Sequence, residues 1–200
     1  MSERQKKSDR RVARTRRLLS EALVGLIQEK RFDSITVQDV IDRADVGRAT
    51  FYAHFRDKED LFLSAWTRLL DWFVSGIEWE KAGEGRFMPV RDLFQHAQEF
   101  QPFYRALALS RKTDSIFNTG LGYLTARIEH DLTLFLASRP QPSVLIPVLA
   151  NYMASEILGL LRWWLEHNMP YTPGRMDEMF HELIRPSLRS VCRDALAAAR

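Results

Sequence analysis

The stretch from Ile35 to Phe62 reads ITVQDVIDRADVGRATFYAHFRDKEDLF and decides the fold of this chain. Thr36 is a good helix N-cap, and Asp39 three residues later completes a capping-box-like pattern with its carboxylate in the positive first turn. The pattern predicts a short helix from Val37 to Arg43, a turn, and a second short helix from Arg48 to His54. Two short helices joined by such a turn form a helix-turn-helix.

Apolar residues would hold the two short helices at a fixed angle and leave one side of the second helix free. Val40, Ile41 and Val46 supply contacts between the helices, and Phe51 and Phe55, four residues apart, face inward. A helix of seven residues, about 10 Å long, fits end-on into a DNA major groove about 12 Å wide. The side chains left to face outward or to lie at the edges are those of Arg48, Ala49, Thr50, Tyr52, Ala53 and His54.

These outward side chains carry the chemistry for reading DNA. The Arg48 guanidinium can pair with guanine O6 and N7, while Ala49 and Thr50 can touch a thymine methyl group or a phosphate. Donors suited to phosphate oxygens, which position a protein on DNA, are found on Tyr52, His54 and Lys58.

Basic side chains crowd the beginning of the sequence. Residues 1–17 carry eight arginines and lysines against two acids, a charge of +6, so the rest of the chain sums to −3. Apolar spacing predicts a helix over residues 9–29, on which Arg10, Arg14 and Arg17 share one face. A basic tip on a near-neutral body favours a polyanion such as double-stranded DNA as partner. The alternative is a solvated, disordered start.

The motif TFYxHFxxKxxL at residues 50–61, with its flanks over about residues 10–62, resembles the DNA-binding signature of the TetR family of transcriptional regulators. The resemblance implies that Lys58 and the start of the next helix bind a backbone phosphate, as an electropositive helix N-terminus does. Asp45 stands where the family usually has glycine, a turn that aspartate tolerates, and Gly47 where serine is common. The DNA contacts that the resemblance implies are Thr36, Gln38, Arg48, Ala49, Thr50, Tyr52, His54 and Lys58.

The rest of the chain shows apolar spacings of three and four and no strand-like alternation, which predicts an all-α fold. We expect a DNA-binding domain over residues 1–57 and a helical ligand-binding and dimerisation domain over 58–200. Residues 159–173, which begin GLLRWWLEHNMP, resemble a branch of the family related to dihydroxyacetone kinase regulators. After a long helix that starts near Lys58 and a loop at 80–89, the expected helices are 90–99, 101–110, 114–138, 143–168 and 174–198, the last with Pro186 as a potential kink.

Aromatic residues are concentrated beyond the helix-turn-helix, where all five tryptophans lie. An aromatic-rich helical domain can line an apolar cavity, although an ordinary core is the alternative for each residue. The family resemblance implies a ligand pocket, for which we expect a small and largely apolar effector. The candidate pocket residues are Trp66, Phe73, Phe103, Tyr123, Tyr152 and Trp163.

The expected helix at 143–168 is apolar on more than one face, whereas a surface helix needs one apolar stripe. The excess predicts a second partner, and two such helices from each subunit would form a four-helix interface, as the resemblance also implies. A homodimer would read a palindrome. The candidate interface residues are Leu149, Met153, Leu160, Leu161, Trp164, Phe180, Leu183 and Ile184.

Other function classes find little support in the sequence. The histidines lack metal-ligand spacing, and there is no HExxH, CxxC, P-loop or dinucleotide motif, so we expect no metal, no cofactor and no enzyme. Cys192 alone fits a reducing cytosol and a small buried role, and the N-terminus lacks the apolar region of a signal peptide. The apolar segment 144–161 contains Glu156, which is costly in a bilayer, so we expect a cytoplasmic protein without a membrane partner.

The sequence therefore predicts a ligand-responsive transcriptional regulator, a repressor that binds a palindromic operator as a dimer and is released by a small molecule. The alternative is a co-activator with the same head and a protein-binding body. A helical enzyme and a pure interaction module fit less well, because neither explains the basic helix and the outward set of DNA-binding side chains.

Overall fold

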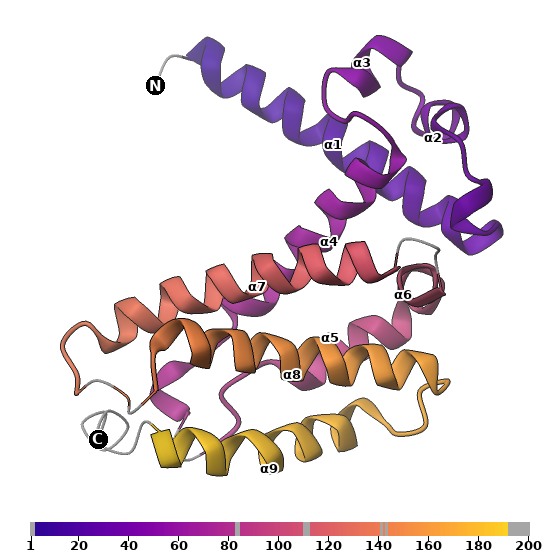
Figure 1. Cartoon of the computed structure of the whole chain (residues 1–200). Helices are drawn as coiled ribbons and strands as arrows, with labels where there is room; N and C mark the ends of the chain where they lie inside the picture. The colour runs from indigo at the N-terminus through magenta and orange to yellow at the C-terminus, as the bar shows by residue number, and fades with distance from the viewer. Residues whose placement is uncertain (1–2, 83–84, 110–112, 141, 143, 192–200) are drawn as a thin grey trace. The chain divides into compact units, whose positions relative to one another are not determined.

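The computed structural model describes residues 3–82, 85–109, 113–140, 142 and 144–191, over which the chain forms helices and no strand (Figure 1). This confirms the all-α prediction. Within these residues, no helix is long and apolar enough to cross a membrane. The elements are α1 (Glu3–Glu29), η1 (Phe32–Ser34), α2 (Val37–Ala44), α3 (Arg48–Tyr52), α4 (Lys58–Ser75), η2 (Trp79–Lys81), α5 (Val90–Glu99), α6 (Gln101–Leu109), α7 (Thr113–Leu136), α8 (Ile146–Glu166) and α9 (Pro173–Val191).

The chain divides into two compact units inside α4, the first ending at Trp66 and the second beginning at Thr67. The sequence-based boundary lay earlier, between residues 57 and 58. The first turns of α4 group with the first unit because the Phe62 ring packs on Phe32 with 5.0 Å between centroids, and Leu61 is fully buried.

The first unit, which we call the head, is built on α1, against which α2 packs (Figure 1). α1 begins at Glu3, earlier than the expected residue 9. The capping box at α2 is present: Thr36 Oγ1 accepts a hydrogen bond from Asp39 N, and the Asp39 carboxylate accepts one from Thr36 N. Asp45 ends α2 with φ 51° and ψ 52°, so aspartate does adopt the left-handed conformation that the turn needs.

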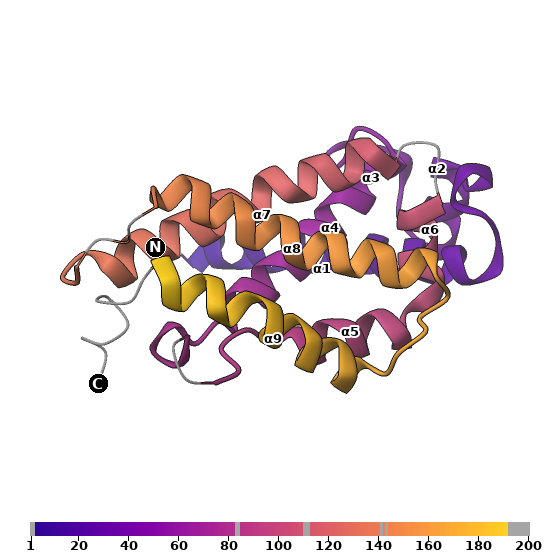
Figure 2. The same ribbon diagram turned by 60° about the horizontal axis from the view of Figure 1, so that its bottom comes forward.

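In the second unit, α7 packs along α8 and α5 packs along α9 (Figures 1 and 2). The α7–α8 contact is apolar, with Ile128 of α7 and Ile157 of α8 both fully buried. Trp164 of α8 meets Phe94 of α5 edge-on, with 4.9 Å between ring centroids. Large side chains from several helices thus fill one core.

The last two helices differ slightly from their expected bounds. α8 starts at Ile146, with proline in its first turn, and ends at Glu166, because Asn168 and Met169 adopt positive φ of 58° and 56°. α9 continues past Pro186 and is described to Val191. Cys192 and the expected continuation to residue 198 lie outside the described residues.

Candidate nucleic-acid interface

The short helix α3 presents one face to solvent and buries the other. Phe51 is fully buried, whereas Tyr52 is 48% exposed and Arg48 and Ala49 are exposed. The Arg48 guanidinium lies over the Tyr52 ring, 5.7 Å from its centroid. α3 ends at Tyr52 rather than at the expected His54, because the backbone tightens to a Phe51–His54 turn. Its exposed face carries a cation and an aromatic hydroxyl, as the sequence predicted.

The first turn of α2 holds two further predicted DNA contacts, Thr36 and Gln38, and both are exposed. The Thr36 hydroxyl is engaged in the cap, since it also donates to Asp39 Oδ2 at 2.7 Å. The Lys30 ammonium, 2.8 Å from Asp39 Oδ2, and the Thr36 hydrogen bonds lower the pKa of Asp39. Gln38 Nε2 donates to Asp42 Oδ1 at 2.7 Å, which leaves the amide oxygen as an acceptor.

Lys58 has an internal role that the sequence did not indicate. Its ammonium donates to the backbone oxygens of Phe32, Asp33 and Ile35 at 2.8, 3.1 and 2.6 Å, and lies 4.9 Å from the centroid of the Phe32 ring. An ammonium has three donors, and three carbonyls engage them. Lys58 thus fastens the start of α4 to the turn before α2. The phosphate contact predicted for Lys58 stays a prediction.

The remaining predicted DNA contacts differ in how exposed their side chains are. Arg10, Arg14 and Arg17 are exposed on α1, and Arg17 forms a solvent-exposed pair with Glu21 at 3.0 Å. Thr50 and His54 are half-buried.

Arg16 was not singled out by the sequence, where it looks like its neighbours in the basic run. Its guanidinium lies 5.0 Å from the Phe55 ring centroid and donates to Ser64 Oγ at 3.1 Å, so it ties α1 to α4 within the head.

The candidate pocket residues differ in how deeply they are buried. Trp66, Phe73 and Phe103 are buried, and a hydrogen bond to Asp71 raises the pKa of Tyr123. Tyr152 and Trp163 are 36% and 39% exposed on α8, which corrects their assignment to an interior pocket. Because α8 carries apolar residues on more than one face, the spacing of apolar residues in the sequence does not distinguish its exposed positions from its buried ones.

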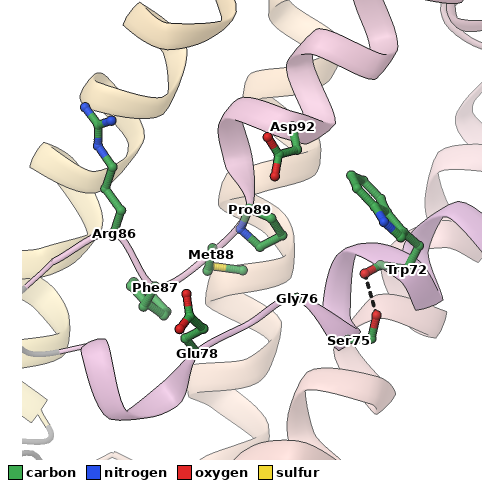
Figure 3. A pocket seen from close by; sticks show the side chains of 9 residues that line it. All are labelled: Trp72, Ser75, Gly76, Glu78, Arg86, Phe87, Met88, Pro89 and Asp92. Carbon is green, nitrogen blue, oxygen red and sulfur yellow. Dashed lines mark hydrogen bonds between the residues drawn. The ribbon is translucent and has the colours of Figure 1, made fainter.

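A cleft that the sequence did not predict lies instead in the second unit, with a volume of about 290 Å³. It is formed by the end of α4, the segment that follows it and the start of α5, and none of the six candidate pocket residues lines it. No group of metal-ligating side chains occurs among the described residues. The lining residues, drawn in Figure 3, are Trp72, Ser75, Gly76, Glu78, Arg86, Phe87, Met88, Pro89 and Asp92.

The candidate dimer residues also need correction. Leu160 is half-buried and Leu183 is 60% exposed, so both can reach a partner. The other six are at most 3% exposed because their own subunit covers them, and we reassign them to the core: Leu149, Met153, Leu161, Trp164, Phe180 and Ile184.

A helix-turn-helix with an exposed reading face and a basic first helix defines a DNA-binding protein. Residues 19–65 match the family model of bacterial regulatory proteins of the tetR family, and residues 89–186 match a model of a transcriptional regulator C-terminal region. The chain belongs to the TetR family of transcriptional regulators.

One curated relative is the HTH-type transcriptional regulator YxbF of Bacillus subtilis (strain 168), 42% identical over 60 residues. That match covers 30% of this chain and 16% of the relative, so it supports the head alone.

Solved structures extend the likeness to both units. A TetR-family regulator from Syntrophomonas wolfei has a TM-score of 0.68 at 19% identity, covering 87% of this chain and 94% of that one. The dihydroxyacetone kinase operon activator DhaS has a TM-score of 0.60 at 17% identity, covering 90% and 98%. NalD, a secondary repressor of a multidrug efflux pump in Pseudomonas aeruginosa, has a TM-score of 0.58 at 19% identity, covering 90% and 97%. At these identities the likeness shows the fold.

Proposed function

We propose that this protein is a ligand-responsive repressor that binds a palindromic operator as a homodimer and is released by a small-molecule effector. The observation that carries the proposal is the exposed face of α3, where Arg48, Ala49 and Tyr52 stand free of the subunit core. A protein that binds chromosomal DNA in a bacterium works in the cytoplasm.

In this proposal the head reads bases with α3 and is positioned by contacts to phosphate. Arg48 has the bidentate geometry that distinguishes guanine from the other bases. Arg10 and Arg14 on α1, together with Tyr52, supply backbone contacts that carry little sequence information. The α2 residues Thr36 and Gln38 lie at the N-terminal end of their helix, where the macrodipole favours phosphate.

Dimerisation is supported by an apolar face that the second unit leaves uncovered. Val148 and Tyr152 of α8 are 55% and 36% exposed, and Leu183 of α9 is 60% exposed. The Tyr152 hydroxyl lies 3.4 Å from Ser187 Oγ, which brings the two helices together at this face. Nothing lies within 4 Å of a Cβ built on Gly159, so a partner helix could approach closely there. We propose this face, with Leu160 at its edge, as the dimer interface.

The direction of regulation has support on both sides. NalD is a repressor, and it shares the fold over most of both chains. DhaS is an activator with a similar TM-score, and it favours the second candidate, a co-activator with the same head and a protein-binding second unit. We propose repression, with the cleft in the second unit as the place for the effector that releases the protein from DNA.

The experiment is to map the bound sites across the source genome and to compare transcripts with and without the gene. A repressor gives inverted-repeat sites that overlap promoters, and the adjacent genes rise when the regulator is deleted. Adjacent genes that fall on deletion would establish the co-activator. Absence of specific sites at all would contradict the DNA-binding function.

A further inference from the structure

Two backbone hydrogen bonds frame the cleft in the second unit. Glu78 N donates to Phe87 O at 2.7 Å, which closes the segment after α4 into a loop, and Val90 N donates to Met88 O at 2.8 Å where α5 begins. Its volume of about 290 Å³ lies near the lower end of the roughly 300–1,000 Å³ of small-molecule sites. The cleft therefore has room for a small ligand.

Two carboxylates make the cleft negative. Figure 3 shows Glu78 and Asp92 on different sides of the lining, with Met88 and Pro89 between them. Asp92 has no hydrogen-bond or ion-pair partner among the described residues. Glu78 pairs with Lys81 at 2.6 Å, but both side chains are 58% exposed, and a pair of this kind is weak. Both carboxylates can therefore accept a cationic group.

Arg86 also lines the cleft, but its charge is directed elsewhere. In Figure 3 its side chain extends away from the other lining residues. Arg86 Nε lies 3.0 Å from Asp177 Oδ2, and a terminal nitrogen lies 3.6 Å from Glu178 Oε1. Because two carboxylates of α9 offset this guanidinium, Glu78 and Asp92 dominate the field inside the cleft.

The apolar part of the wall is centred on Trp72, whose side chain is 45% exposed. Its ring lies 6.3 Å from that of His96, which stacks on Phe100 at 4.6 Å and whose Nδ1 is 2.9 Å from the hydroxyl of buried Tyr104. These contacts hold the indole in place. An indole face beside carboxylates attracts a cation by cation–π and ionic interactions together.

We propose that this cleft binds a small organic cation, an ammonium group on an apolar or aromatic body, and that it is the effector site. The inference rests on the function proposed above. The ammonium is attracted by the carboxylates of Asp92 and Glu78, and the apolar body packs on Trp72. This ligand class differs from the largely apolar effector expected from the aromatic content of the sequence.

Arg86 connects the cleft to the proposed dimer face. It stands on the cleft rim and is paired with the first turns of α9, the helix that carries Leu183. A ligand cation beside Arg86 repels the guanidinium and thereby changes the strength of the Arg86–Asp177 ion pair. Movement of α9 would then change how two heads are spaced, which is how one site biases another.

The test uses three ligands with one scaffold, titrated into the full chain by calorimetry: 3-phenylpropylammonium, 3-phenylpropanol and 3-phenylpropanoate. The ammonium compound should bind at least about fivefold more tightly than the alcohol, the size expected of partly exposed charge pairs, and the carboxylate should bind most weakly. Equal binding of the three, or tighter binding of the alcohol or the carboxylate, would overturn the ligand class.

Variants locate the binding. Asp92→Asn and Glu78→Gln should each weaken the ammonium compound by about fivefold and leave the alcohol unchanged, while Trp72→Ala should weaken both. The controls Asp131→Asn and Glu182→Gln make the same changes elsewhere in the second unit and should have no effect. Equal losses in controls and cleft variants would overturn the site.

A DNA-binding assay with the same samples separates this inference from the proposed function. Release of operator DNA by the ammonium compound, lost in Asp92→Asn, supports the effector role. Binding without release overturns that role. If only a neutral or anionic compound releases DNA, the ligand class is wrong and the regulator function stands. Failure to bind any DNA specifically would overturn the function itself.

Discussion

The two units of this protein build their sites over different distances along the chain. On the exposed surface of α2 and α3 in the head, Thr36 bonds to Asp39 and Arg48 lies over Tyr52, so these partners are three or four residues apart. In the second unit, Arg86 of the cleft pairs with Asp177 of α9, almost half the chain away. Local patterns therefore define the proposed DNA-reading surface, whereas the proposed ligand site and dimer face depend on how distant helices pack.

The largest effect that this comparison predicts is at Leu161, which is fully buried in the second unit. Leu161→Asp should abolish folding of that unit, a loss of more than about 4 kcal/mol, because it leaves an unpaired charge in an apolar core. Leu183→Asp, on the exposed face, should leave the fold intact and weaken self-association. Thermal unfolding and sedimentation measure the two effects. A folded, monomeric Leu161→Asp protein would return Leu161 to the interface.

Lys58 tests a connection within the head between residues distant in sequence, from α4 back to η1. Lys58→Met keeps the apolar stem but removes the ammonium from three carbonyls, and should destabilise the head by about 1–3 kcal/mol. Lys81→Met, an exposed lysine of the second unit, is the matched control. Denaturant unfolding measures stability, and the salt dependence of DNA binding reports phosphate contacts. Unchanged stability with a salt slope lowered by about one unit would make Lys58 a phosphate contact alone.

The cap of α2 is expected to give a smaller effect. Thr36→Ala removes the side-chain oxygen that accepts from Asp39 N and should cost about 1 kcal/mol, while Thr36→Ser should retain most of the stability. Equal losses in the two variants would show that the methyl group, rather than the cap, is what matters.

The accuracy of the sequence-based predictions follows the same division. The capping box and the left-handed turn at Asp45 were predictable, because each depends on the chemistry of a few adjacent residues. The role of Lys58 was not, since its partners are backbone oxygens that carry no residue signature. The family motif matches Lys58 to a phosphate contact and gives no indication of its hydrogen bonds to backbone oxygens.

In the second unit, periodicity located the helices but not their faces. α8 is apolar around much of its circumference, so Leu161 and Tyr152 looked alike, although one is core and the other is exposed. The cleft was missed because residues 80–89 indicated only a loop. Its walls come from two helices and that loop, and their approach is set by tertiary packing.

The smallest expected effect is the pH dependence of the second unit. Burial lowers the pKa of His181, mainly by desolvation; Asp177 opposes this shift, and Arg185 and Arg86 reinforce it. The His181 Nδ1 proton is donated to the Asp177 carbonyl at 2.8 Å, so the neutral ring fits the fold. A lowered folded pKa means that stability is complete above the unfolded value near 6.5 and falls as pH drops below it.

His181→Gln should therefore reduce the loss of stability between neutral pH and about pH 5, as followed by denaturant midpoints. His96, whose pKa is also lowered by burial, should account for part of what remains. An identical pH profile in His181→Gln would show that this histidine does not contribute.

The central claim is that the exposed face of α3 reads DNA sequence. Anisotropy titrations of wild type, Arg48→Ala and Arg10→Ala against a mapped operator and a scrambled duplex, at several salt concentrations, test it directly. The account predicts that Arg48→Ala loses about 1–3 kcal/mol on the operator and little on the scrambled duplex, while Arg10→Ala weakens both alike and lowers the salt slope. A wild-type protein that binds both duplexes equally, or an Arg48→Ala protein with unchanged preference, would contradict it.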